Sequence, residues 1–196
     1  GPRQVGKTTL INQLRNELIT AKGVNPQNVF YFNLDIVTDQ QVFLDQTAFI
    51  RFLKNRLGAD QKIYIFVDEA QRIENSGLFF KGVYDLHLPV KLILTGSSTL
   101  EIRSKIMEPL TGRKRLFQLL PLSFSEYLSY HDPSLVPFVT TFDTYANAKI
   151  MAHLITFMHY GGYPKVVVTD TANAKTTLLE EIYGSYIEKD VIGLMK

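Results

Sequence analysis

The chain opens with the stretch Gly1-Pro2-Arg3-Gln4-Val5-Gly6-Lys7-Thr8-Thr9, which has the G-x-x-x-x-G-K-T spacing of a phosphate-binding P-loop. Glycines let the backbone turn tightly, so that successive N–H groups can point at one phosphate. In such a loop the ammonium group of Lys7 lies against the β- and γ-phosphates, and the hydroxyl of Thr8 is a ligand of Mg²⁺. A helix beginning here would point its positive N-terminal end at the same anion. We therefore expect residues 1–9 to bind a nucleoside triphosphate.

The composition is that of an ordinary soluble chain of 196 residues, long enough for one domain and part of a second. A net charge of +2 is too small to indicate nucleic-acid binding by itself. The absence of cysteine excludes a disulfide scaffold or a thiolate metal site and suits a cytoplasmic location. No apolar run approaches the ~20 residues that span a bilayer, so no membrane partner is expected. Because the sequence starts without methionine and inside a motif, we expect it to be an excerpt of a longer protein.

Apolar runs alternate with amphipathic patterns after the loop. Strands are expected at 28–34, 63–67, 91–94 and 115–120, and helices at about 7–22, 44–57 and 79–86 and from 98 to before 109. Ser123-Phe124-Ser125-Glu126 has the pattern of a capping box and predicts a further short helix. Strands that alternate with helices at these lengths predict an α/β fold with a parallel sheet and right-handed crossovers.

The pattern changes near residue 131. Helical spacing runs through 145–158, stops at Gly161-Gly162-Tyr163-Pro164 and resumes through 178–187, and the strongest strand signal in this part, at 166–168, is short. We therefore expect a core at 1–131 and a mainly helical extension at 132–196.

The apolar strand at 63–67 ends in two adjacent carboxylates, Asp68 and Glu69. In open α/β sheets ligands bind at the carboxyl ends of the strands, where this pair would emerge. Asp68 is expected to bind Mg²⁺, and Glu69 to orient and deprotonate the water that attacks the γ-phosphate. A solvated acidic pair after a core strand is the alternative reading.

The next strand carries hydroxyls at its tip. Thr95 or Ser97 is expected to contact the γ-phosphate or the water as a sensor, whereas a capping box already accounts for Ser98. Arg113 lies in a basic loop and is a candidate arginine finger or sensor, ahead of Arg103 and Arg115; the alternative is a solvated basic loop. The histidines at 131, 153 and 159 show no metal-ligand partners.

Four segments together resemble the prokaryotic AAA+-like ATPases: G-P-R-Q-V-G-K-T-T-L-I at 1–11, V-D-E-A-Q-R-I at 67–73, T-G-S-S at 95–98 and E-P-L-T-G-R-K-R-L-F-Q-L-L-P-L-S-F-S-E-Y-L at 108–128. The later G-G-Y-P and Y-I-E-K-D resemble the start of the uncharacterised C-terminal domain that accompanies this ATPase core. The resemblance implies a P-loop NTPase core of the ASCE type, with ATP and Mg²⁺ as ligands. By motif position it assigns Lys7 and Thr8 to phosphate and metal, Asp68 to the metal and Glu69 to the base.

Two departures from the family pattern are expected to matter. The N-terminal strand before the P-loop is missing, and in the family's sheet order it lies between the strands at 115–120 and 91–94, so these two edges would lack a hydrogen-bond partner. The C-terminal domain breaks off after residue 196, so DNA could be contacted only through parts not in this chain.

We therefore predict a Mg²⁺-dependent ATPase, with a homo-oligomer left open. The first alternative is a nucleotide switch that hydrolyses ATP slowly and signals to a partner or to DNA. A helicase is a weaker reading, because no second motor domain or basic-aromatic track is present. GTPases are disfavoured because the sequence has no N-K-x-D motif. A small-molecule kinase stays open as an alternative, although Glu69 beside Asp68 favours water as the acceptor.

Overall fold

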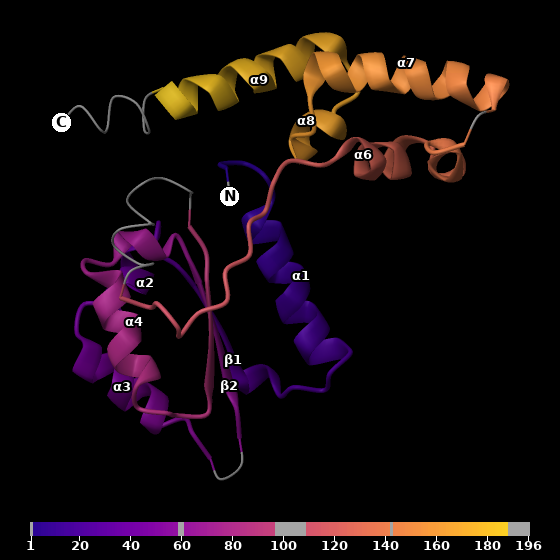
Figure 1. Ribbon diagram of the computed structural model, residues 1–196. Helices are drawn as coiled ribbons and strands as arrows, with labels where there is room; N and C mark the ends of the chain where they lie inside the picture. Colours follow the sequence, from indigo (N-terminus) through magenta and orange to yellow (C-terminus); the bar gives the residue numbers. More distant parts are fainter. Residues whose placement is uncertain (1, 59–60, 97–108, 142, 188–196) are drawn as a thin grey trace. The chain divides into compact units, whose positions relative to one another are not determined.

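The computed structural model describes residues 2–58, 61–96, 109–141 and 143–187 (Figure 1). By its internal contacts the chain forms two compact units. One comprises Lys7–Phe117, and the other combines Gly1–Gly6 with Gln118–Lys196. The sequence analysis put the boundary after residue 131, whereas this division along the chain falls after Phe117. The two units are described separately below as the sheet unit and the helical unit.

The sheet unit contains a three-stranded parallel sheet of order β1-β2-β3. Its strands are β1 (Val29–Asn33), β2 (Ile63–Asp68) and β3 (Val90–Leu94). The central strand has the continuous apolar sequence typical of a strand covered on both faces, and only Tyr64 of its six residues is not fully buried. The expected α/β P-loop NTPase core with parallel strands is confirmed.

Helices cover both faces of this sheet (Figure 1). They are α1 (Lys7–Thr20), α2 (Val37–Gln41), α3 (Gln46–Lys54) and α4 (Ser76–Tyr84), with short 3₁₀ turns η1 (Pro26–Asn28) and η2 (Ala70–Arg72). Side chains of β2 alternate between the two faces. Ile65 and Val67 pack in a core with Phe49 of α3 and Phe80 of α4, whereas Phe66 packs on the other face with Ile11 of α1.

The strand expected at 115–120 does not form, and this prediction is wrong. These residues form no strand, and Leu116, Phe117 and Leu120 are 64%, 78% and 57% exposed. A strand needs a neighbour to complete its hydrogen-bond ladder. In the sheet order implied by the resemblance that neighbour precedes the P-loop, and the described residues contain no such strand. The helix expected from residue 98 lies outside the described residues.

The helical unit consists of α6 (Phe124–His131), the 3₁₀ segment η4 (Pro133–Phe138), α7 (Thr144–Tyr160), α8 (Pro164–Val167) and α9 (Ala172–Tyr186). The capping box at Ser123 and Glu126 is present as expected, and its hydrogen bonds lower the pKa of the Glu126 carboxyl. The short strand signal at 166–168 falls on α8 and its C-cap, so this region is helical. No helix in the described ranges is both long enough and apolar enough to cross a bilayer.

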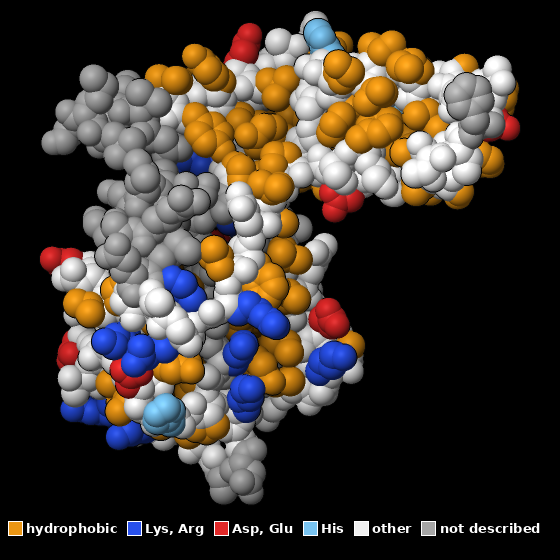
Figure 2. Space-filling model, in the orientation of Figure 1, with side chains coloured by type: hydrophobic (Ala, Val, Ile, Leu, Met, Phe, Trp, Pro, Cys, Tyr) orange, Lys and Arg blue, Asp and Glu red, His pale blue; other side chains and the backbone are white. Residues whose placement is uncertain are grey.

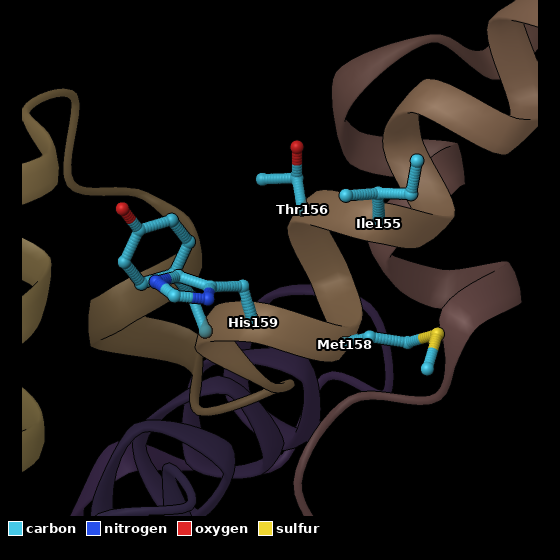
Figure 3. Close-up of a pocket in the computed structure, with 5 residues that line it drawn as sticks. Ile155, Thr156, Met158 and His159 are labelled. Carbon is cyan, nitrogen blue, oxygen red and sulfur yellow. The ribbon is translucent and has the colours of Figure 1, made fainter.

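Apolar side chains gather on the surface of the helical unit, whereas Lys and Arg side chains are more frequent over the sheet unit (Figure 2). The C-terminal half of α7 lines an open pocket (Figure 3) with Ile155, Thr156, Met158, His159 and Tyr160. Ile155 and Met158 are 62% and 77% exposed. None of these residues is one that the sequence assigns to a nucleotide or a metal.

The turn between α7 and α8 requires both of its glycines. Gly161 has φ 73°, and a Cβ on Gly162 would lie 2.0 Å from the carbonyl oxygen of Leu122. The N–H of Leu122 donates to the carbonyl of Gly162 at 2.7 Å, which fixes the turn against the segment before α6. This turn places Tyr163, at the N-cap of α8, in a half-buried position.

Tyr163 is expected to ionise unusually late. Burial, followed by a hydrogen bond to Tyr186, raises the pKa of Tyr163 to about 12. Because an unfolded tyrosine ionises near pH 10, its contribution to the stability of the helical unit is complete below about pH 10 and is lost as the pH rises towards about 12. Tyrosinate absorbance should show this late step in the wild type and not in Tyr163→Phe. The control Tyr145→Phe removes a ring that is 73% exposed and should leave the step in place.

Candidate nucleotide-binding site

The candidate site is built around Asp68, the last residue of β2, which is only 3% exposed. Its Oδ2 accepts a hydrogen bond of 2.6 Å from the hydroxyl of Thr8, in the first turn of α1. Two residues that lie 60 positions apart in the sequence are therefore in direct contact. Both belong to the sheet unit, so the start of α1 lies at the carboxyl end of the central strand.

Further donors surround the same carboxylate. The hydroxyl of Thr95 and the backbone N–H of Glu69, the latter at 3.2 Å, donate to Oδ1 of Asp68. The hydroxyl of Tyr31 donates to Oδ2 at 3.4 Å. Hydrogen bonds to both oxygens offset the cost of burying this carboxyl group.

The parallel sheet explains why these side chains meet. Asn33 of β1 is in register with Asp68, so Tyr31 lies two residues back on the neighbouring strand. Thr95 directly follows β3, and its N–H donates to the carbonyl of Val67 at 2.9 Å. The carboxyl ends of all three strands therefore share one edge, as expected for ligand sites in open α/β sheets.

Glu69 adopts a backbone conformation that is uncommon for a residue with a side chain. Its φ and ψ are 56° and 42°, in the left-handed region, and it begins the turn η2. This conformation costs a non-glycine residue about 1–2 kcal/mol. The side-chain amide of Gln71, two residues later, donates to Oε2 of Glu69. The Glu69 carboxylate is thus held within the turn that follows β2.

A family model described as an AAA domain matches residues 1–128 of the chain. The chain belongs to the AAA domain family. It is also 26% identical over 192 residues to "Uncharacterized protein MJ1544" of Methanocaldococcus jannaschii, a match that covers 98% of this chain and 41% of that protein. It is 26% identical over 193 residues to an uncharacterized protein of Haemophilus influenzae, covering 97% of this chain and 44% of that one. The chain spans less than half the length of these relatives.

The P-loop of this AAA domain belongs partly to each unit. Pro2, Arg3, Gln4, Val5 and Gly6 belong to the helical unit, α1 begins at Lys7 in the sheet unit, and Gly1 lies outside the described residues. Gln4 and Gly6 have positive φ angles of 56° and 90°, as a tightly turned loop requires. Lys7 is half-buried, and Thr9, the last predicted loop residue, is exposed on the first turn of α1.

Tyr31 lies at the candidate site in this AAA domain, and the sequence analysis missed it. Burial and then the negative charge of Asp68 raise the pKa of its hydroxyl. The guanidinium group of Arg15, on α1, lies 4.7 Å from the centre of its ring. The one sequence feature that could have indicated a site residue here is the polar hydroxyl of Tyr31, because its neighbours Phe30 and Phe32 are entirely apolar.

The structure does not bring Arg113 to Asp68. Its Nε donates to Oδ1 of Asp85 at 2.8 Å, at the C-cap of α4. Asp85 lies four residues before Pro89. The carbonyl oxygen of Pro89 accepts a hydrogen bond from the N–H of Ile63, which is the first residue of β2. The pair therefore lies towards the amino ends of the strands in this AAA domain. Arg115 lies near Phe117, with its guanidinium group 6.0 Å from the ring centre. Ser97, Ser98 and Arg103 lie outside the described residues.

The residues present at the edge of the sheet fit a hard cation. Among the described residues no three His, Cys, Asp or Glu side chains come together as a metal site. Mg²⁺, however, is usually held by one or two protein oxygens together with substrate phosphates and water. The Thr8 hydroxyl and the Asp68 carboxylate are such oxygens, and they are adjacent.

Proposed function

We propose that this AAA domain binds ATP together with Mg²⁺ and hydrolyses the γ-phosphate. The family match supports nucleotide binding. The observation that carries the finer proposal is the 2.6 Å contact between Thr8 and Asp68, because it joins the two halves of a P-loop site. Thr8 and Asp68 would hold Mg²⁺, which when bound neutralises charge on the phosphates.

Phosphate binding is the role of Lys7 and the start of α1. The first turn of α1 contains no acidic side chain, so the positive end of the helix and the Lys7 ammonium would both attract an anion. Residues 1–9 would add the remaining backbone N–H groups of the loop. This arrangement favours a triphosphate over a neutral ligand.

Hydrolysis requires a group that orients water and accepts its proton. Glu69 is the candidate, because it follows Asp68 directly and is only partly buried. Thr95 is our candidate sensor, since its hydroxyl bonds to the carboxylate of Asp68. Ser97 remains a prediction from the sequence.

One observation favours the alternative of a slow nucleotide switch. The Glu69 carboxylate accepts from Gln71, and a hydrogen bond to this carboxylate lowers its basicity as a general base. A turnover assay separates the two functions. A rate below about 10⁻³ s⁻¹, comparable to an unassisted GTPase, supports the switch, and a faster rate supports the ATPase.

Substitution of Thr8 tests the site with little change of volume. Thr8→Val removes the hydroxyl, and we expect it to lose most of the gain in ATP affinity that Mg²⁺ provides, about tenfold or 1.4 kcal/mol. Thr8→Ser retains the hydroxyl and should behave as the wild type. Calorimetric titration with ATP, in Mg²⁺ and in EDTA, measures both. Equal Mg²⁺ dependence in Thr8→Val and the wild type would refute the assignment of Thr8 as a ligand of Mg²⁺.

The cytoplasmic location, a homo-oligomer and a signal to DNA are further proposals that rest on the sequence. An arginine finger at Arg113 would have to act on a neighbouring subunit, since within its own chain the residue pairs with Asp85.

A further inference from the structure

Parts of three motifs of the sequence lie in the helical unit. They are the P-loop, G-G-Y-P at 161–164 and the start of Y-I-E-K-D at 186. The backbone N–H of Arg3, inside the P-loop, donates to the hydroxyl oxygen of Tyr186 at 2.9 Å. Tyr186 is the last residue of α9, and 183 positions separate it from Arg3. The loop that the sequence assigns to phosphate therefore contacts a side chain near the far end of the chain.

Tyr186 is itself held by a second tyrosine. Burial and then a hydrogen bond to the side chain of Tyr186 raise the pKa of Tyr163, so the two hydroxyl groups lie close to each other. Tyr163 directly follows the turn in which Gly162 lies against Leu122. The hydroxyl oxygen of Tyr186 thus accepts from Arg3 in the loop and lies close to Tyr163 on a fixed turn.

We propose that Tyr186, supported by Tyr163, is a positioning residue that holds the first half of the P-loop in its phosphate-binding conformation. The inference rests on the proposed ATP-binding function. Gln4 and Gly6 both have positive φ, and ordering each residue of such a loop costs conformational entropy. A contact that orders Arg3 before the ligand arrives reduces the part of this cost that binding must supply.

The same hydrogen bond between Arg3 and Tyr186 allows the opposite effect on ATP affinity. An N–H group that donates to Tyr186 is not directed at a phosphate oxygen, so the hydroxyl could act as a competitor of the nucleotide. The two effects differ in sign, because loss of a positioning contact weakens ATP binding whereas loss of a competitor strengthens it. The direction of the change in affinity therefore decides between them.

The test replaces Tyr186 by Phe, which removes only the hydroxyl. We expect the Kd and the KM for ATP to rise about three- to tenfold, with kcat within twofold of the wild type, because the contact lies in the binding loop and not at Glu69 or Asp68. Tyr163→Phe should have a smaller effect in the same direction. The control is Tyr183→Phe, on the same helix, where the side chain is 68% exposed and no change is expected. An unchanged or lowered Kd in Tyr186→Phe would overturn the proposal.

Hydrogen exchange tests the contact without any nucleotide. In Tyr186→Phe the amides of residues 2–6 should exchange faster than in the wild type, whereas Tyr183→Phe should leave them unchanged. If the wild type failed to bind ATP, the proposed function would fall while the exchange result still reported on the loop. Unchanged exchange in Tyr186→Phe would overturn the positioning role by itself.

Discussion

Replacement of Glu69 by Gln is expected to lower kcat for ATP hydrolysis at least about a hundredfold, while the Kd for ATP stays within about threefold of the wild type. The amide keeps the size of the side chain and can still hydrogen-bond within the turn. It cannot accept the proton that water loses on attacking the γ-phosphate. Steady-state phosphate release and ATP titration measure the two quantities.

Glu74→Gln is the matched control for this variant. Glu74 lies five positions later and is exposed, so its neutralisation removes the same charge without touching the carboxyl end of β2. Its kcat should equal that of the wild type. If Glu69→Gln lost ATP binding as severely as turnover, Glu69 would belong to the binding apparatus and its role as general base would be wrong.

Replacement of Lys7 by Ala is expected to abolish ATP binding in practice, raising the Kd by at least about a hundredfold, or about 2.7 kcal/mol. Lys7 supplies the one side-chain cation of the G-K-T sequence, and α1 begins at this residue. The matched control is Lys22→Ala, just beyond α1, where the lysine is exposed. Titration with a fluorescent ATP analogue gives the affinities, and circular dichroism shows whether the total helix content is unchanged.

The two substitutions are informative together. Loss of binding in Lys7→Ala with retained binding in Glu69→Gln assigns the residues to separate steps. Retained binding in Lys7→Ala would contradict the P-loop assignment, whatever the result at Glu69.

Helices and strands whose formation depends only on their own residues could be predicted from the sequence. The continuous apolar run Ile63-Tyr64-Ile65-Phe66-Val67 predicted a buried strand, which is β2. The capping box at Ser123 is likewise present, as its local pattern predicted. The segment at 115–120 has similar strand propensity, but a ladder also needs a neighbour, which local sequence does not provide. The helix α2 escaped prediction because it is five residues long and has no side-chain cap.

The contact between Thr8 and Asp68 followed from motif spacing, because a P-loop and an acidic strand end require each other to form one site. Tyr31 and the left-handed conformation of Glu69 did not follow. Both depend on how β1, β2 and the turn η2 pack together, which no local pattern describes. The pairing of Arg113 with Asp85 likewise depends on the path of the chain after residue 108.

The left-handed backbone at Glu69 has a consequence for how this sequence can change over time. Glycine would adopt the same torsion angles without the steric penalty, but it would also increase the conformational entropy of the unfolded chain and lose the hydrogen bond from Gln71, so these effects on stability oppose each other. A change to glycine at position 69 would therefore remove the carboxylate with little change in stability, so the backbone here does not by itself retain the acidic side chain.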